Sequence, residues 1–397
     1  MMLEMQPRTR VPRAPLGRRL LLRATAGLGA IGAPLVAAVA GRPGTALPAS
    51  YAAGGWRLGE TALAGSLERE RPGRWSTGRH ATEPFRMVAL TWSGDLDATL
   101  RVRTRSRGTW SEWQVLRAME DGPDPDAAEG TLERRGVHPL WVPRSDGVEV
   151  LVTGERRPDA LRLVLIDPGR LDSDDSETPS LPQQRPGSAR GGKRRRAPRP
   201  ALRSRRDWGA DESLREGKPV MCRTIQQVHV HHTASGNDYS RAEVAGLIRG
   251  FYRYHTQSLG WSDLGYNFLV DRFGRTWVGR AGGPGRPVRG AHTLGFNHTS
   301  VGVAVIGNFE GHRVPDRVVK ALVRLSAWKL DAYGRSPRGK ARVYSKGSDL
   351  YPTGWVRLKV IDGHRDTNQT ACPGEELQRR LPEIRKRARY HVKRARR

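Results

Sequence analysis

The sequence predicts a two-domain chain, with a small all-β, sandwich-like domain over residues 55–170 and an α/β domain over residues 204–388. Three observations lead to this prediction. In the first range, short runs of alternating apolar and polar residues are separated by turn residues, which is typical of antiparallel strands. In the second range, apolar strands alternate with segments of helical periodicity, which favours a mixed central sheet with flanking helices. The chain of 397 residues is also longer than one ordinary domain.

Residues 1–40 have the order of a secretory signal peptide. Arg18 and Arg19 stand before a run of leucines, and an Ala/Gly-rich apolar stretch follows as far as the AVA sequence at 38–40. The paired arginines also resemble a twin-arginine signal, which exports folded proteins. Pro34 interrupts the apolar stretch, so a membrane-spanning helix is not expected. We therefore expect a secreted protein, located outside the cell or at the cell wall.

The predicted β domain is recognised by its alternating residues. Leu100, Val102 and Thr104 alternate with arginines, so one face of this strand is expected to be buried and the other solvated. Further strands are predicted at residues 87–92, 148–152 and 161–166. Four tryptophans leave two interpretations open, a sugar-stacking platform or ordinary core and cross-strand packing, of which packing is the more common. They are Trp92, Trp110, Trp113 and Trp141.

The formal charge of +29 is unevenly distributed along the chain. Residues 185–206 hold ten basic side chains and no acid, and residues 379–397 hold ten with a single acid. Such runs are usually solvated and attract polyanions, so we expect a disordered basic linker over residues 171–203 and a basic tail over residues 389–397. Anionic wall polymers are candidate partners of both segments, and a plain solubilising role is the alternative. No groove-reading motif accompanies the charge, so a specific nucleic-acid partner is not expected.

The elements of the α/β domain follow from its hydrophobic periodicity. A strand is expected at residues 227–231, followed by an amphipathic helix at 241–256. Ser240 is the expected N-cap of this helix, and Glu243 would complete a capping box. A hairpin, a buried strand and two more helices are expected at residues 266–278, 301–306, 316–333 and from 375 into the basic tail.

Three histidines on the first strand of this domain allow a metal site but do not require one. Alternate residues of a strand face the same way, so His229 and His231 share a face and His232 lies on the other. The spacing suits a chelating pair formed by His229 and His231. It suits a strand that carries three ordinary histidines equally well, and spacing alone leaves both interpretations open.

A second segment, residues 363–374, favours the metal interpretation. Pro373 and Gly374 directly follow Cys372 and begin a helix, whose N-terminus favours a thiolate. His364 is expected at the end of a strand, from which the intervening loop lets it reach the same point. Two imidazoles and one thiolate leave the fourth tetrahedral position open for water, which is the pattern of a catalytic zinc site.

Nine short blocks then occur in order between residues 205 and 388. They are RDWGA (206–210), VHHTA (230–234), WSDLGYNF (261–268), GAH (290–292), GFN (295–297), SVGV (300–303), GNF (307–309), GHRD (363–366) and TACPG (370–374). In these blocks the chain resembles the zinc N-acetylmuramoyl-L-alanine amidases of the peptidoglycan recognition protein and phage-amidase type. The preceding β domain and linker also resemble exported actinobacterial members.

The resemblance implies one zinc ion per chain, with His231, His364 and Cys372 as its ligands. The catalytic tyrosine of the family falls on Tyr266, and Thr370 occupies a position from which it would help to stabilise developing charge. Candidate substrate-binding residues are His232, His292 and Asn297. Because a disulfide sulfur cannot bind zinc as a thiolate, we expect Cys222 to remain unpaired.

The function implied by the resemblance is that of a secreted, monomeric hydrolase. It would cut the amide bond between N-acetylmuramic acid and L-alanine in peptidoglycan, with muropeptides as its ligands. The alternative is a non-catalytic peptidoglycan-binding protein, because some family members lack a metal. Binding-only members typically replace the cysteine, which is present here as Cys372, so the hydrolase is favoured.

Overall fold

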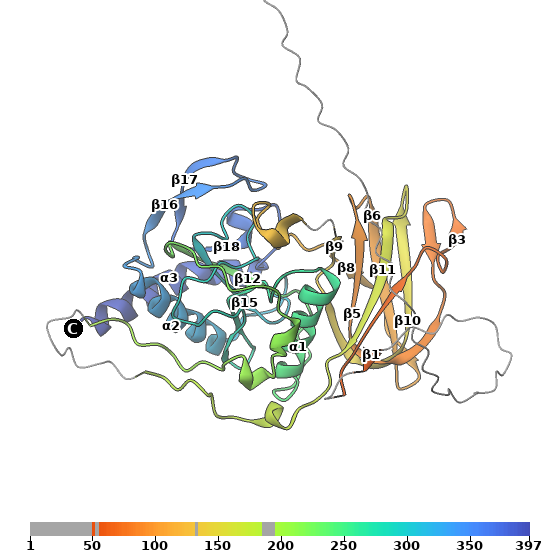
Figure 1. Ribbon diagram of the computed structural model, residues 1–397, viewed down its shortest axis with the longest axis horizontal. Helices are drawn as coiled ribbons and strands as arrows, with labels where there is room; N and C mark the ends of the chain where they lie inside the picture. Colours follow the sequence, from red (N-terminus) through yellow and green to blue (C-terminus); the bar gives the residue numbers. More distant parts are fainter. Residues whose placement is uncertain (1–49, 52–54, 132–133, 185–194) are drawn as a thin grey trace, which may run out of the picture. The chain divides into compact units, whose positions relative to one another are not determined.

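The computed structural model describes residues 50–51, 55–131, 134–184 and 195–397. The expected export signal lies outside the described residues. The described residues belong to one compact unit, which contains both predicted domains (Figure 1). Within the described ranges, no helix is both long enough and apolar enough to cross a bilayer.

The N-terminal domain is all β, as predicted. Its strands are β1 Ser50–Tyr51, β2 Arg57–Ala62, β3 Glu68–Arg71, β4 Arg74–Ser76, β5 His80–Ser93, β6 Ala98–Ser106, β7 Thr109–Trp110, β8 Gln114–Leu116, β9 Arg134–Gly136, β10 Leu140–Gly154 and β11 Asp159–Asp167. They join in one sheet in the order β1-β2-β11-β5-β10-β4-β3, with β6 to β9 attached to this path. All of these pairings are antiparallel.

Strand β6 shows why the alternating pattern predicted this fold. Leu100, Val102 and Thr104 are buried, whereas the arginines between them are partly exposed. Of the four tryptophans, Trp92 and Trp141 are buried in the core. The remaining two, Trp110 and Trp113, lie against the guanidinium group of Arg103, 5.5 and 4.8 Å from the ring centroids. All four therefore have packing partners within the protein.

The C-terminal domain is built on a mixed sheet, also as predicted. Its strands are β12 Gln227–His232, β13 Phe268–Val270, β14 Thr276–Val278, β15 Ser300–Val305 and β18 Ile361–Gly363, in the order β14-β13-β15-β12-β18. Strand β12 runs parallel to both β15 and β18, and β14 adds an antiparallel edge. All six residues of β12 are buried, as expected for a central parallel strand covered on both faces.

Three helices accompany this sheet: α1 Val244–Arg253, α2 Asp316–Ala332 and α3 Glu375–Ala395. Helix α1 begins three residues later than the sequence predicted and continues as a π-helical turn, Tyr254–Ser258. The Glu243 carboxylate accepts a hydrogen bond from the backbone N–H of Ser240, which is one half of the predicted capping box. Ser240 does not cap α1, because residues 241–243 form a turn before the helix.

A second hairpin was not predicted from the sequence. It consists of β16 Lys340–Ser345 and β17 Gly354–Lys359, which pair only with each other among the described strands. Residues of β16 are alternately exposed and buried. The sequence therefore did contain a strand signal at this place.

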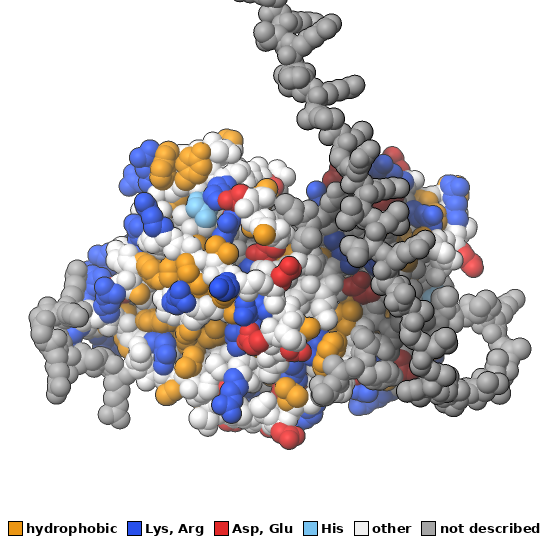
Figure 2. Space-filling model, in the orientation of Figure 1, with side chains coloured by type: hydrophobic (Ala, Val, Ile, Leu, Met, Phe, Trp, Pro, Cys, Tyr) orange, Lys and Arg blue, Asp and Glu red, His pale blue; other side chains and the backbone are white. Residues whose placement is uncertain are grey.

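The basic linker and the basic tail are more ordered than expected over their described residues. Leu181 and Leu202 pair through their backbones, and residues 185–194 between them lie outside the described part. Helix α3 continues through residues assigned to the tail, because Val392 on its inner face is buried. Lys and Arg side chains are scattered over the visible face of the C-terminal domain and do not gather in one patch (Figure 2).

Helix α1 and the turn that follows it pack against the β domain. The Tyr254 hydroxyl donates a hydrogen bond to the carbonyl of Val137, at 3.0 Å. At Gly250, a Cβ would come within 2.7 Å of the Cε of Met87 in strand β5, so the helix and the strand approach each other closely here. Buried side chains of both domains belong to one continuous core cluster. The two domains are therefore joined by a shared hydrophobic core as well as by the linker.

Candidate metal centre

The strand ends of the C-terminal sheet bring three predicted ligands together. His231 lies on β12, and His364 follows β18 directly, in the short 3-10 turn His364–Asp366. Cys372 stands just before helix α3. Ligand atoms of these three buried residues all lie within 4.8 Å of one another. Since β12 and β18 are parallel, their carboxyl ends meet at one edge of the sheet, where binding sites of such sheets are usually found.

The distance between Cys372 and His231 suits a tetrahedral zinc ion. Zinc bonds of about 2.0–2.3 Å place two ligands about 3.3 Å apart when both are nitrogen or oxygen, and about 3.6 Å apart when one is sulfur. Cys372 Sγ lies 3.6 Å from His231 Nδ1. On the far side of that ring, His231 Nε2 lies 3.2 Å from both His292 Nδ1 and Thr293 Oγ1, which fix the orientation of the imidazole.

His229 does not join this cluster. Its Nδ1 lies 2.8 Å from the Asp362 carboxylate, which is buried in the same sheet. The choice between His229 and His231, which strand spacing left open, is therefore made by tertiary packing.

The protonation states of the cluster are compatible with metal binding. Burial lowers the pKa of His364 and of His292 well below the ordinary value, so both rings are neutral at neutral pH. Neutral imidazole is the form that ligates a metal. Burial raises the pKa of the Cys372 thiol well above its ordinary value, and a cation bound beside the sulfur would be needed to hold it as a thiolate.

Both predicted catalytic residues lie next to the cluster. The Tyr266 ring centroid is 5.5 Å from that of His231, and the Tyr266 hydroxyl donates a hydrogen bond to the Asp121 carboxylate. Thr370 Oγ1 accepts a hydrogen bond from the backbone N–H of Cys372 at 3.0 Å. It also donates to the carboxylate of Glu120 at 3.2 Å.

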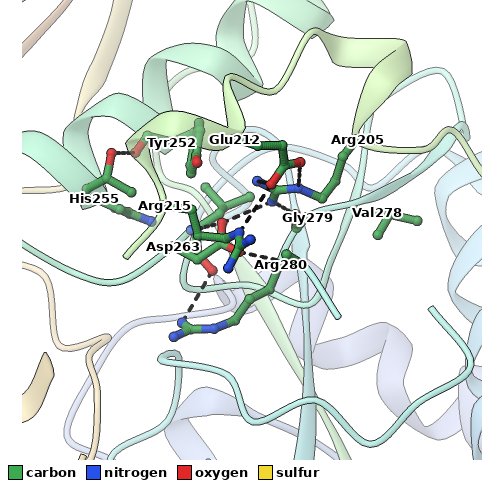
Figure 3. A network of polar contacts seen from close by, with 12 residues as sticks. Arg205, Glu212, Arg215, Tyr252, His255, Asp263, Val278, Gly279 and Arg280 are labelled. Carbon is green, nitrogen blue, oxygen red and sulfur yellow. Dashed lines mark hydrogen bonds and ion pairs between the residues drawn. The ribbon is translucent and has the colours of Figure 1, made fainter. Parts of the chain in front are cut away.

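A network of ion pairs holds the segment that leads into Tyr266 (Figure 3). The guanidinium group of Arg205 pairs with Asp263 at 3.0 Å and with Glu212 at 2.7 Å. The second oxygen of Asp263 accepts a hydrogen bond from the backbone N–H of Ala281 at 2.8 Å. Since Asp263 is buried and precedes Tyr266 by three residues, the network fixes the backbone from which the tyrosine projects.

The three predicted substrate-binding residues have different surroundings. Asn297 is buried and uses its Oδ1 to accept hydrogen bonds from the backbone N–H groups of His292 and Thr293. His292 is also buried, directly behind His231. His232 points away from both, and its Nδ1 accepts a hydrogen bond from the backbone N–H of Phe309 at 3.2 Å. It lines a cavity of about 490 Å³ together with Thr370, Cys372 and Glu120.

The two cysteines are both free, as expected. Cys222 is partly exposed, and its Sγ lies 3.6 Å from the carbonyl oxygen of Asn297. Burial raises the pKa of its thiol to about 11, so this sulfur is a neutral thiol at physiological pH.

Sequence reasoning missed the acidic residues that contact this centre from the β domain. Asp121 and Glu120 belong to a segment between β8 and β9 that contains five acids within ten residues. In a chain with a net charge of +29, such an acidic cluster was a usable signal. The contacts of this cluster with the metal centre were not predictable, because the segment is more than a hundred residues away in sequence from His231, His364 and Thr370.

Both domains of the chain are similar to known protein families. Residues 221–375 match the family model of N-acetylmuramoyl-L-alanine amidases, and residues 58–186 match the model described as Rv3811 N-terminal galactose-binding domain-like. Peptidoglycan-recognition protein SC1a of Drosophila melanogaster is 31% identical over 148 residues, which cover 37% of this chain and 67% of that protein. The chain belongs to the peptidoglycan-recognition and N-acetylmuramoyl-L-alanine amidase family.

Other members of this family give similar matches. Peptidoglycan-recognition protein SA of Drosophila melanogaster is 34% identical over 139 residues, which cover 34% of this chain and 66% of that protein. The solved structure of wild-type Drosophila PGRP-LB is 25% identical with a TM-score of 0.36, covering 45% of this chain and 91% of that chain. Family membership connects this chain with peptidoglycan recognition or amidase activity.

Proposed function

We propose that this protein is a secreted, zinc-dependent N-acetylmuramoyl-L-alanine amidase, which hydrolyses the amide bond between N-acetylmuramic acid and L-alanine in peptidoglycan. The observation that carries the proposal is the cluster of His231, His364 and Cys372, whose ligand atoms lie within 4.8 Å of one another beside Tyr266. One zinc ion per chain would be held by these three residues. Export would depend on the signal expected in residues 1–40.

Each residue of the centre has a defined part in this proposal. A bound zinc ion would polarise the amide carbonyl and lower the pKa of a water molecule. Burial raises the pKa of Tyr266 well above its ordinary value, so its hydroxyl keeps its proton and would donate a hydrogen bond to the developing oxyanion. Thr370 would donate a second hydrogen bond from beside Cys372. Asn297 and His292 would shape the substrate groove, and His232 would line the neighbouring cavity.

The alternative is a non-catalytic peptidoglycan-binding protein. The named relatives are recognition proteins, which supports this alternative. A protein that only binds muropeptides does not require two buried imidazoles and a thiol whose ligand atoms lie within 4.8 Å of one another. The presence of that set together with a neighbouring tyrosine favours the enzyme.

Metal analysis of two matched cysteine variants tests the proposal. The wild-type protein and Cys222→Ala are expected to carry about one zinc ion per chain, because Cys222 lies outside the cluster. Cys372→Ala is expected to lose the metal and with it any capacity for muropeptide hydrolysis. Zinc content that is the same in Cys372→Ala as in Cys222→Ala would refute the proposed mechanism.

A further inference from the structure

A short acidic segment of the β domain contacts the candidate metal centre and its surroundings. We call residues 120–129 the acidic loop. Each of its carboxylates has a partner in the C-terminal domain. The pairs are Glu120 with Thr370, Asp121 with His231, His364 and Tyr266, Asp124 with Arg289 and Asn297, Asp126 with Arg289 and Lys346, and Glu129 with Arg280 and Ser262.

Asp121 occupies the position expected of a fourth metal ligand. Its Oδ1 lies 3.1 Å from His231 Nδ1 and 3.2 Å from His364 Nδ1. A tetrahedral zinc ion requires about 3.3 Å between such ligand atoms. Oδ1 makes no hydrogen bond with the described residues, although its side chain is only 1% exposed. A buried oxygen without a hydrogen-bond partner, facing two imidazole nitrogens, is the arrangement that a shared cation would satisfy.

The second oxygen of Asp121 engages the proposed catalytic tyrosine. It accepts the hydrogen bond of the Tyr266 hydroxyl, which is the donor proposed for the substrate oxyanion. One carboxylate therefore faces both the metal position and the oxyanion donor. A substrate amide would have to displace it from both.

The rest of the loop contacts residues that are proposed to shape the substrate groove. Asn297 Nδ2 donates to the carbonyl of Gly122 and to the Asp124 carboxylate, each at 3.0 Å. The same carboxylate accepts from the backbone N–H of Gly295 at 2.8 Å and pairs with Arg289 at 2.8 Å. Asp124 is fully buried, so these contacts are not those of a solvated surface ion pair. The amide nitrogen of Asn297, a residue proposed to shape the substrate groove, therefore already donates its hydrogen bonds to the acidic loop.

We propose that Asp121 is the fourth ligand of the metal and that the acidic loop is a built-in occupant of the substrate groove. The folded chain is then a latent enzyme, in which the carboxylate must leave the metal before water and substrate can take its place. This inference rests on the proposed function, because it concerns the regulation of the same site.

Three aspartate variants separate the two halves of the inference. Asp121→Ala removes the metal contact, and Asp124→Ala releases the groove without touching the metal centre. Asp95→Ala is the matched control, because Asp95 is an exposed aspartate of the same domain that pairs with the exposed Arg135. Zinc affinity is measured by competition with a chromophoric chelator, and muropeptide affinity by calorimetry on the metal-free full-length chain, in which no turnover occurs. Thermal unfolding checks that each variant is folded.

The inference predicts a distinct pattern for each variant. Asp121→Ala should bind zinc at least about tenfold more weakly, because a ligand has been lost. It should bind a disaccharide–tetrapeptide muropeptide at least about tenfold more tightly, because the acidic loop would then leave the substrate groove more often. Asp124→Ala should show the gain in muropeptide affinity with unchanged zinc affinity, and Asp95→Ala should match the wild type.

Several outcomes would overturn the inference. Unchanged zinc affinity in Asp121→Ala would remove Asp121 from the metal, and unchanged muropeptide affinity in both loop variants would leave the groove unoccupied by the loop. Loss of hydrolysis in Asp121→Ala at unchanged muropeptide affinity would make Asp121 a catalytic carboxylate instead. If the affinities change as predicted but no variant cleaves muropeptides, loop occupancy stands and the amidase proposal fails.

Discussion

Tyr266 has two possible hydrogen-bond acceptors in this account, the Asp121 carboxylate in the latent chain and the substrate oxyanion in the active one. The catalytic role of Tyr266 is best tested in a protein that lacks the Asp121 carboxylate. In zinc-loaded protein carrying Asp121→Ala, the further change Tyr266→Phe should lower kcat for muropeptide hydrolysis about 100-fold, because an oxyanion donor is removed. Zinc content should not change. Tyr344→Phe, a change at an exposed tyrosine on β16, is the control. Equal kcat in the Tyr266 and Tyr344 variants would exclude the catalytic role.

The residues of the centre were only partly predictable from the sequence. Strand alternation placed His229 and His231 on one face but did not show which of them faces the metal centre. In the structure His229 lies against the Asp362 carboxylate instead. The ordered family blocks favoured His231, and the structure places it beside His364 and Cys372. Asp121 was beyond sequence reasoning, because its contact with His231 joins residues of different domains.

At the scale of elements, the segment between the two domains is held by a buried ion pair. Arg249 on α1 pairs with Asp174 through both carboxylate oxygens at 2.7 Å, and both side chains are almost fully buried. The same guanidinium group donates to the carbonyls of Pro168, Gly169 and Trp208. These bonds explain why the residues expected to begin a disordered linker are ordered here.

Removing Arg249 should lower the stability of the folded protein. Arg249→Ala would leave the Asp174 carboxylate buried without its partner, which is expected to lower the free energy of unfolding by about 3–5 kcal/mol. Arg241→Ala removes a solvated pair with Glu177 and should cost less than about 1 kcal/mol. Urea denaturation of both variants measures the difference. A loss below 1 kcal/mol in Arg249→Ala would show that the pair does not anchor the segment.

Elements with a clear period were predicted well, and those set by tertiary contacts were not. The strands β6 and β12 lie where alternation and apolar runs placed them. The start of α1 was wrong by three residues, since a capping box alone does not fix where helical hydrogen bonds begin. The order of residues 195–203 and of the end of α3 depends on contacts such as the Leu181–Leu202 pairing, which composition does not reveal.

At the scale of the whole molecule, the net charge of +29 and the basic residues at the end of α3 lead us to expect that the protein binds anionic wall polymers. Three basic residues near the end of the chain are exposed: Lys393, Arg394 and Arg397. Truncating the chain before them would also remove the buried Val392 and so damage the packing of α3. Changing these three to glutamine keeps the helix and removes only the charge. Sedimentation with anionic cell walls should weaken at low salt, and the difference should vanish at high salt.

A matched triple variant distinguishes a local effect from net charge. Arg135, Arg144 and Arg156 are exposed on the β domain, and their change to glutamine removes the same charge elsewhere. This variant should sediment like the wild type. Equal weakening by both triple variants would show that the end of α3 has no special role.

Product analysis tests the central claim most directly. A defined disaccharide–tetrapeptide muropeptide is incubated with zinc-loaded Asp121→Ala protein, with and without a chelator, and the products are identified by mass spectrometry. Without the chelator, the products should contain one added water, with a free lactyl carboxylate on the disaccharide and a free amine on the L-alanine of the peptide. With the chelator, no cleavage is expected. Intact muropeptide in both samples, or cleavage within the peptide or the sugar, would contradict the central claim.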